Sequence, residues 1–424
     1  MIARRPHPPP VVPLGVDEAV EHGGVEGLDA QSLISLRLML RQLEVLGVMP
    51  TVLGALARVP RQRFVDRFWS PPQGTFEANA IREWNVGDDD PSQVAALLHD
   101  AHRALAVHAA YEWGDALSTL SAPAVIASLL QNLDVAPGMR VLEIGSGTGY
   151  TTALLAELAG DPSLVTSIEI DRQLSMSATE RLAELGYAGV HLVEGDGDLG
   201  VEADAPYDRI IATVGCEDLS PAWRDQLTPD GIVVAPVSRG LEHPLVKASG
   251  RDTGFVGRVV DRSTFVRIQG LQAMSPSIPT LRQRADSAIE STSIPTELAV
   301  ALETTTISPA AAIWGLEYYL ALRAPATDPT VLVSEDGDSV AILDANSRSI
   351  SSSGPHGATC SAELLARASD WVGLGSPTPM DYTSSWHLLP LGEDDAPGNR
   401  TGPWTCRRVH HLEVVELDWG AATL

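Results

Sequence analysis

Short apolar runs alternate with stretches of helical periodicity through the middle of the chain. The first run, 141–144, ends at a glycine turn and is followed by apolar residues at helical spacing. Buried strands that alternate with helices are typical of a mostly parallel sheet covered by helices. The pattern therefore predicts an α/β, Rossmann-like fold with a sheet of seven strands. The six further strand candidates lie at 164–170, 190–194, 207–214 and 227–239, with two more within 245–270.

Helical periodicity also marks the chain before this region. Residues 1–30 are rich in proline and glycine and predict a flexible N-terminal arm. Apolar positions over 32–47 predict a helix with Ser32 as its N-cap, and a second helix is expected over 51–58. The stretch 93–113 predicts a further helical piece.

The last third of the chain has a pattern of its own. Prolines and small polar residues at 271–294 predict a linker, and 295–424 predicts an additional C-terminal α+β domain, a candidate for substrate recognition. Tryptophans such as Trp314 and Trp371 leave two interpretations open, a peptide-binding surface or core packing. The expected elements are a helix at 310–324, a hairpin turned at 336–337, a helix at 361–375 and a strand at 407–419.

Length and charge narrow the classes of protein. A chain of 424 residues exceeds one ordinary core and favours two domains. The 55 acidic against 29 basic residues give a net charge of -26, which argues against a nucleic-acid partner. Cys216, Cys360 and Cys406 are far apart and predict neither a disulfide framework nor a metal site. We find no apolar signal segment and no run long enough for a membrane span, so we expect a cytoplasmic protein without a membrane partner.

The glycine turn after the first strand carries the first candidate chemistry. Its glycines at 145, 147 and 149 let the backbone approach a ligand closely, and the helix that follows presents N–H groups to it. A dinucleotide site would carry GxGxxG and bind a pyrophosphate. Here Glu143 precedes the first glycine, where its charge would repel a phosphate and suit a cation. A glycine turn that only closes the strand–helix unit is the alternative.

Three phrases, in order, resemble those of a known family. EIGSGTG at 143–149 resembles the loop of class I S-adenosylmethionine methyltransferases, and VPRQRFV at 59–65 and STLSAP at 118–123 resemble phrases of the protein L-isoaspartyl O-methyltransferases. The resemblance covers about 33–270 and implies a class I methyltransferase domain with N-terminal helices, over 31–270. It also implies S-adenosylmethionine as cofactor and a peptide or protein bearing Asp or isoAsp as substrate. The segment at about 70–115 is longer than in the family and is interpreted as an insertion.

The resemblance assigns roles in a cofactor site. Glu143 would face the amino-acid end of the cofactor, and Glu169 would accept both ribose hydroxyls. Asp171 is a less favoured substitute for Glu169, because a helix N-cap explains it better. Asp196 would lie near the adenine amino group. The predicted cofactor-binding residues are Glu143, Gly145, Ser146, Gly147, Gly149, Glu169, Asp196, Gly197 and Thr213.

The acceptor side follows from the chemistry of a carboxylate. An acceptor that is already ionised at neutral pH needs alignment and no strong base. The resemblance points to the hydroxyls of Ser121 and Thr119 as the catalytic groups that orient it, although Ser121 also fits a helix N-cap. Val214 stands where the family has alanine, which leaves the acceptor identity open. Cys216 is a reactive thiol or, more simply, a buried small residue. No metal is expected.

We therefore expect an O-methyltransferase that esterifies an Asp or isoAsp carboxylate of a peptide and so leads to a succinimide (aspartimide) and isoaspartate. The added domain and the insertion resemble extended actinobacterial homologues that act on ribosomally synthesised, modified peptides, which favours a modified precursor peptide as substrate. Three alternatives stay open: general repair of isoaspartyl proteins, methylation of a small molecule, and a non-catalytic peptide-binding protein. The sequence leaves the oligomeric state undetermined.

Overall fold

A computed structural model describes most of the chain and divides it into two compact units. The first unit holds Met1–Cys216, Ser220–Pro236 and Ser263–Gln272, and the second holds Glu217–Leu219, Val237–Arg262 and Ala273–Leu424. The residues described are 20, 28–70, 72, 81–110, 115–238, 243–252, 254–263, 290–303, 308–323, 330–334, 338–388, 404–407 and 411–417. Most of the predicted N-terminal arm and most of the predicted linker lie outside them.

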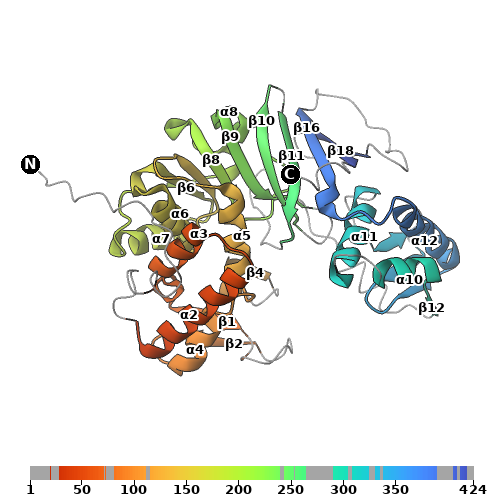
Figure 1. Cartoon of the computed structure of the whole chain (residues 1–424), viewed down its shortest axis with the longest axis horizontal. Coiled ribbons are helices and arrows are strands. Elements are labelled where there is room, and N and C mark those ends of the chain that lie inside the picture. Colours follow the sequence, from red (N-terminus) through yellow and green to blue (C-terminus); the bar gives the residue numbers. More distant parts are fainter. Residues whose placement is uncertain are drawn as a thin grey trace, which may run out of the picture. The chain divides into compact units, whose positions relative to one another are not determined.

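Five parallel strands form the centre of the first unit, in the order β7-β6-β5-β8-β9. All four residues of β5 are buried, as expected for a strand covered on both faces. Helices α5 to α8 pack against these strands (Figure 1). The strands are β5 (Val141–Ile144), β6 (Val165–Glu169), β7 (His191–Glu194), β8 (Tyr207–Ala212) and β9 (Leu227–Pro236). The helices are α5 (Pro123–Leu133), α6 (Tyr150–Ala159), α7 (Arg172–Glu184) and α8 (Pro221–Gln226).

This arrangement confirms the predicted α/β fold. The strand order places β5 at the point where the connections reverse direction, and ligands of doubly wound sheets bind beyond the carboxyl ends of the strands at that point. The helix caps also follow from the sequence. Asp171, for example, accepts hydrogen bonds from the main-chain N–H groups of Gln173 and Leu174 at 2.8 and 3.0 Å and so begins α7.

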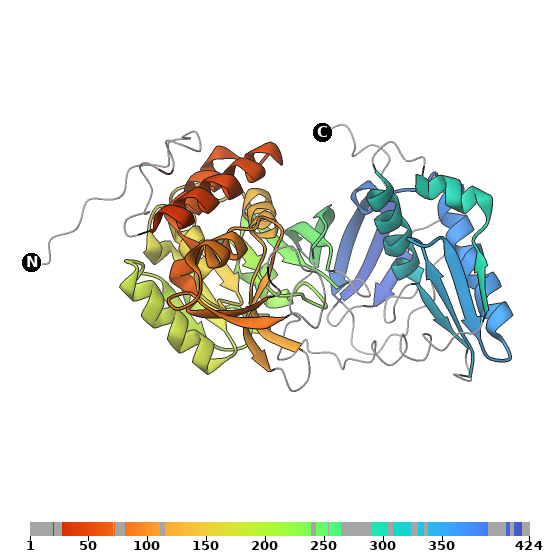
Figure 2. The ribbon, with the colours of Figure 1, turned by 90° about the horizontal axis from the view of Figure 1, so that it is seen from below.

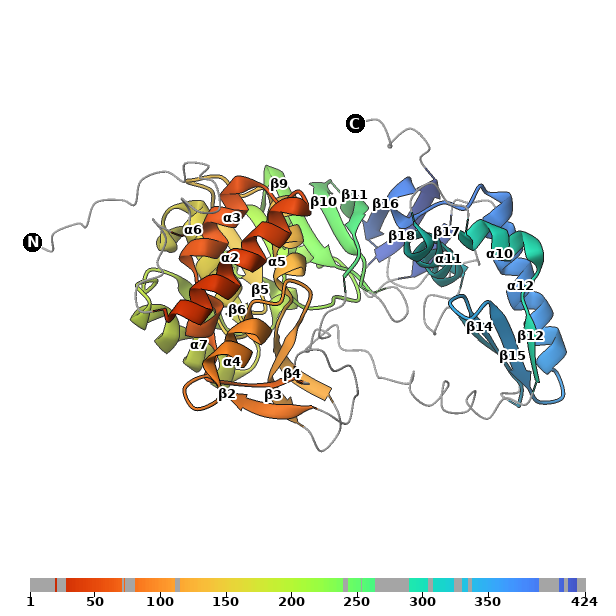
Figure 3. The ribbon, with the colours of Figure 1, turned by 60° about the horizontal axis from the view of Figure 1, so that its bottom comes forward.

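A second, small sheet belongs to the same unit and has the order β2-β1-β3-β4 (Figure 3). The predicted helix over 93–113 is wrong after residue 98, because among the described residues 93–110 the helix α4 (Pro91–Leu98) is followed by a turn and a strand. Asp100 turns the chain by accepting from the N–H of His102, and the next residues form β3. The other elements here are α2 (Ala30–Val45), α3 (Pro50–Arg58), the 3-10 turn η1 (Arg61–Phe64), β1 (Arg67–Ser70), β2 (Arg82–Asn85), β3 (Leu105–Ala110) and β4 (Asp115–Leu120).

Both predicted N-terminal helices are present. The N-cap of α2 is Asp29 and not Ser32, because the Asp29 carboxylate accepts from the N–H groups of Gln31 and Ser32. Helix α2 packs against α3 and α4 through its buried face. In the described part of the chain, none of the helices is both long and apolar enough to span a membrane.

Antiparallel strands make up much of the second unit. Five of its strands follow one another in the order β10-β11-β16-β18-β17, and four others form a sheet in the order β12-β15-β14-β13. Helix α12 packs on β14 and β15, and α10 packs on α12 (Figure 2). The strands are β10 (Leu245–Arg251), β11 (Gly254–Asp261), β12 (Glu290–Ser293), β13 (Val331–Val333), β14 (Val340–Asp344), β15 (Ser349–Ser353), β16 (Tyr382–Leu388), β17 (Trp404–Arg407) and β18 (His411–Leu417). The helices are α10 (Thr296–Glu303), α11 (Pro309–Arg323) and α12 (Gly357–Gly373).

The second unit contains the predicted helices at 310–324 and 361–375 and the predicted hairpin, since β13 pairs antiparallel with β14. Strands β10 and β11, which we predicted within the methyltransferase domain, are grouped with this unit by their contacts. The reason is that β11 pairs with β16 over five residues, Gly254 to Arg258. The end of the predicted linker forms β12, which pairs with β15. Trp371 and Trp386 are buried, which favours core packing for these two tryptophans.

Candidate active site

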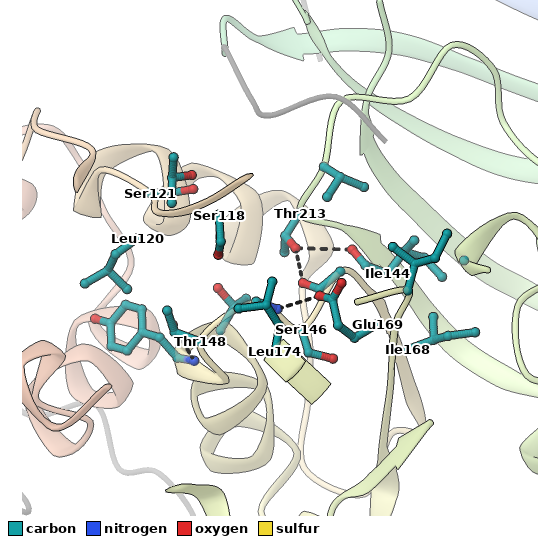
Figure 4. A pocket seen from close by; sticks show the side chains of 18 of the residues that line it. Ser118, Leu120, Ser121, Ile144, Ser146, Thr148, Ile168, Glu169, Leu174 and Thr213 are labelled. Carbon is teal, nitrogen blue, oxygen red and sulfur yellow. Dashed lines mark hydrogen bonds between the residues drawn. The ribbon is translucent and has the colours of Figure 1, made fainter. Parts of the chain in front are cut away.

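A pocket lies beyond the carboxyl ends of β5, β6 and β8 in the first unit. Figure 4 shows Ser118 and Ser121 on one side of the pocket and Ile168 and Glu169 on another. The lining residues come from β4 and the start of α5, from the glycine turn, from the end of β6 and the start of α7, and from Gly197, Thr213 and Val214.

Glycine is required at two positions of the pocket wall. Gly145 has a φ of +91°, and a Cβ there would lie 2.8 Å from Cγ1 of Val214. A Cβ at Gly197 would lie 2.3 Å from Cγ2 of Ile144, closer than any real contact. The main chain at these positions can therefore approach the ends of β5 and β8 only without a side chain.

Glu169, the last residue of β6, lines the pocket with its carboxylate almost buried. One oxygen accepts from the N–H of Gly147 at 2.9 Å, and the other accepts from the N–H of Asp171 at 3.1 Å. These bonds fix the carboxylate against the glycine turn. Because an ionised carboxylate has about four acceptor positions, two of them are left for hydroxyl donors of a ligand.

Glu143 lies behind the pocket wall and does not line it. Its side chain is fully buried, and Oε2 accepts from the hydroxyls of Thr152 and Ser167 at 2.5 and 2.7 Å. Burial raises the pKa of the Glu143 carboxyl to about 8. The role predicted for this acid, facing the amino-acid end of a cofactor, stays a prediction; the register of β5 against β6 sets Glu143 opposite Ser167. Ser167 in turn shares a hydrogen bond with Ser146, which does line the pocket.

Gly149, Asp196 and Thr213 take three different places. Gly149 is the N-cap of α6 and is not part of the pocket lining. Asp196 caps a short 3-10 turn by accepting from the N–H of Asp198 at 2.9 Å, whereas the adjoining Gly197 lines the pocket. Thr213 lines it too, and its hydroxyl lies within hydrogen-bond distance of the carbonyls of Gly145 and Ile144, which ties the ends of β8 and β5 together.

The opposite wall is formed by the STLSAP segment. Ser118, Thr119 and Leu120 end β4, and Ser121 follows as the chain turns into α5. The N-cap of α5 is Ala122, without a side-chain hydrogen bond, so Ser121 does not cap this helix. Arg61 is buried beneath the segment and donates to the carbonyls of Ser121 and Leu120 at 2.9 and 3.3 Å. The structure thus places both predicted catalytic hydroxyls, of Ser121 and Thr119, on the pocket wall.

Eight of the eleven predicted site residues line the pocket: Thr119, Ser121, Gly145, Ser146, Gly147, Glu169, Gly197 and Thr213. Several lining residues were not predicted. Ser118 belongs to the STLSAP phrase and could have been nominated from it. The apolar residues Ile144, Ile168, Ile170 and Leu174 carry no signal that separates them from core residues, although Ile144 and Ile168 end their strands beside nominated positions.

Cys216 lies in the interior of the protein. Cys216 is fully buried, and its thiol lies 3.4 Å from the carbonyl of Val214, so the small-residue interpretation holds. Among the residues that the structure describes, no three His, Cys, Asp or Glu side chains are close enough together to hold a metal ion.

Comparisons with known proteins identify the family of this chain. The family model of protein-L-isoaspartate(D-aspartate) O-methyltransferase matches residues 36–273, more than half of the chain. The chain is similar to protein-L-isoaspartate O-methyltransferase 2 of Rhodopseudomonas palustris, with 34% identity over 203 residues, 46% of this chain and 92% of the relative. It is also similar to the protein-L-isoaspartate O-methyltransferase of Anaeromyxobacter dehalogenans, with 35% identity over 228 residues, 54% of this chain and 91% of the relative.

A solved structure of a protein-L-isoaspartate O-methyltransferase aligns with 82% of this chain and 96% of its own, at 21% identity and a TM-score of 0.48. The family match and the two relatives confirm the predicted enzyme class and the predicted cofactor. The chain belongs to the protein-L-isoaspartate(D-aspartate) O-methyltransferase family and is an O-methyltransferase that uses S-adenosylmethionine.

Proposed function

We propose that this enzyme esterifies the carboxylate of an Asp or isoAsp residue in a ribosomally synthesised, modified peptide. The observation that carries the proposal is a pocket with two unlike walls. One wall offers the carboxylate of Glu169 and apolar strand ends, and the other offers the hydroxyls of Ser118, Thr119 and Ser121. The first wall suits a nucleoside, and the second suits an anionic acceptor.

The first wall fits S-adenosylmethionine by its donor set. Glu169 keeps two acceptor positions for a pair of ribose hydroxyls, and the main chain at Gly145 and Gly197 approaches closely because no side chain is present. Ile144 and Ile168 supply apolar contacts for a flat ring. Gly145, Ser146, Gly147, Glu169, Gly197 and Thr213 would hold the cofactor, which supplies a methyl group on a positively charged sulfur. Glu143, Gly149 and Asp196 would act indirectly, by supporting the strand ends and turns that carry these residues.

The second wall orients the acceptor without removing a proton from it. A side-chain carboxylate is ionised at neutral pH, so hydrogen-bond donors that align one of its oxygens are sufficient. Ser121 and Thr119 are the proposed donors, and both lie on the pocket wall. Withdrawing the carboxylate from water into this pocket makes it a better nucleophile.

The later steps need only the peptide. The backbone nitrogen that follows the methylated residue attacks the ester carbonyl, the N–H proton leaves with the methoxy group as methanol, and a succinimide ring closes. Water opens the ring at either carbonyl and gives Asp or isoAsp. Two added parts of the chain support a modified peptide as the substrate: the second unit and the enlarged segment that contains β2 and β3. An enzyme for general repair must accept many exposed sequences and would have little use for either part.

The experiment is an intact-mass assay with labelled S-adenosylmethionine. Three peptides are offered: a linear isoaspartyl peptide, a cyclised peptide with one Asp, and the same cyclised peptide with Asn at that position as control. We expect a methyl gain and then the loss of methanol on the Asp peptide only. Ready turnover of the linear isoaspartyl peptide would instead establish general repair, and no methyl gain on any Asp or isoAsp peptide would refute the proposed function.

A further inference from the structure

Arg61 begins the 3-10 turn η1 and is almost completely buried, with 1% of its surface exposed. Its guanidinium reaches two consecutive carbonyls of the acceptor wall. Nη1 donates to the carbonyl of Ser121 at 2.9 Å, and Nη2 donates to that of Leu120 at 3.3 Å. Only a planar fork with several N–H groups can serve two carbonyls in this way. Arg61 therefore fixes the main chain of the segment that carries the proposed catalytic hydroxyls.

The same guanidinium also touches the cofactor wall. Its Cζ atom lies 5.6 Å from the ring centroid of Tyr150, the first residue of α6 after the glycine turn. Tyr150 lines the pocket, and Phe64 packs edge-on against its ring at 5.4 Å. Arg61 thus joins the glycine turn to the STLSAP segment from behind the pocket.

The charge of Arg61 is not matched by a carboxylate. In the described part of the chain, no Asp or Glu lies within ion-pair distance of it; Asp100, the acid that acts on it electrostatically, pairs with Arg103 at 3.4 Å. Its other neighbours are neutral, because burial raises the pKa of Tyr150 to about 12 and lowers that of His99 to about 4. A buried cation without an anionic partner is costly, and a bound anion would lower that cost.

We propose that Arg61 is a positioning residue for the acceptor: it holds the Leu120–Ser121 main chain in place and makes this end of the pocket favourable for a carboxylate. The inference rests on the proposed function and deepens it. An acceptor without negative charge would gain nothing from the guanidinium, so Arg61 contributes to the selection of a carboxylate over a neutral group such as an amide.

A purely structural role is the competing explanation. Losing a structural residue lowers the melting temperature and weakens cofactor binding and turnover together. Losing a positioning residue changes the kinetics toward the peptide while the cofactor Kd stays the same. Two substitutions separate the contribution of the charge from that of the paired hydrogen bonds. Arg61→Lys keeps the charge and loses the planar guanidinium, whereas Arg61→Met keeps much of the shape and loses both the charge and the guanidinium.

The test measures kcat and KM for the peptide that the wild type methylates, the cofactor Kd by calorimetry, and the melting temperature. We expect kcat/KM to fall about 10-fold in Arg61→Lys and about 100-fold in Arg61→Met, from the loss of one or two charge-assisted hydrogen bonds, with a cofactor Kd within about twofold of wild type. Arg58→Lys and Arg58→Met are the matched controls, since Arg58 ends α3, bonds Glu157 at 2.6 Å and does not line the pocket. The controls should retain wild-type kinetics.

A double-mutant cycle with Ser121→Ala completes the test. If Arg61 acts through Ser121, the combined loss is smaller than the product of the two single losses. Losses that multiply fully, a cofactor Kd that rises in step with the loss of turnover, or folded Arg61 variants with unchanged peptide kinetics would each overturn the inference. Should Arg61→Met fail to fold, Arg61→Lys carries the same comparison. A wild-type enzyme that methylates no peptide refutes the proposed function, whereas an active wild type with unaffected Arg61 variants refutes only the role of Arg61.

Discussion

Glu169→Gln tests the cofactor wall most directly. The two carboxylate oxygens of Glu169 accept from Gly147 and Asp171 and, in our proposal, from two ribose hydroxyls. Glutamine has one accepting oxygen. Its NH₂ group would therefore face either a main-chain N–H group or a ribose hydroxyl, and that donor would lose its acceptor. At least one charge-assisted hydrogen bond to the ligand is lost. Each contributes about 1.5–3 kcal/mol, so the Kd for S-adenosylmethionine should rise roughly 10- to 150-fold.

Calorimetry with S-adenosylmethionine and with its 2′-deoxy analogue distinguishes the loss of a hydrogen bond to the ribose from a general disturbance of the glycine turn. The wild type should bind the analogue more weakly, whereas Glu169→Gln should distinguish the two ligands little, because the lost bond is the same one. Glu194→Gln is the matched control, since Glu194 ends the neighbouring strand β7 and does not line the pocket. An unchanged Kd in a folded Glu169→Gln variant, or an equal preference for the ribose hydroxyl in both proteins, would refute the assigned role.

Three further predictions concern stability. Because folding raises the pKa of Glu143, the folded state holds a proton that the unfolded state releases. The free energy of unfolding should therefore fall as the pH rises from about 4.5 to 8, by at most about 1.4 kcal/mol per pH unit. Chemical denaturation at several pH values should show a smaller slope in Glu143→Gln. Gly197→Ala should cost about 1–3 kcal/mol from overpacking against Ile144, and more than Gly195→Ala, whose Cβ would meet only the flexible end of Ile168 at 3.2 Å; melting curves rank the two. Asp171→Ala should cost about 1 kcal/mol through the lost N-cap of α7, with an unchanged cofactor Kd; a weakened Kd would assign Asp171 to the ligand after all.

The central sheet was predictable because its strands are nearly continuous apolar runs between glycine turns and helices. Residues such as Leu142 and Ile210 are buried on a strand covered from both sides, and this leaves a strong mark in the sequence. The stretch 105–110 was misassigned for the opposite reason. Its alanines favour a helix locally, but the pairing of β3 with β4 and β1 decides the outcome, and those partners are distant in sequence.

The position of a site residue was predictable where it is set by the end of the residue's own strand or turn. It was less predictable where it is set by the pairing with a neighbouring strand. Glu169 ends β6 and lies at the pocket as its position suggests. Glu143 has a similar place in the sequence, one strand earlier, but the register against β6 puts two hydroxyls in front of it. Arg61 was visible only as part of a recognised phrase, because its two carbonyl partners lie about sixty residues further along the chain.

The different surroundings of the two acids also change the electrostatic argument for a cationic ligand. Glu143 was expected to attract a cation by its charge, yet burial raises its pKa to about 8 and so disfavours the charged form. Glu169 lies at the pocket itself, where its carboxylate accepts hydrogen bonds from two N–H groups. In our proposal, the negative charge that favours a sulfonium comes from Glu169 at the end of β6, while the positive charge of Arg61 lies behind the wall proposed for the acceptor. Opposite charges on opposite walls would bring a cationic donor and an anionic acceptor toward each other, which is the arrangement that transfer of a methyl group to a carboxylate requires.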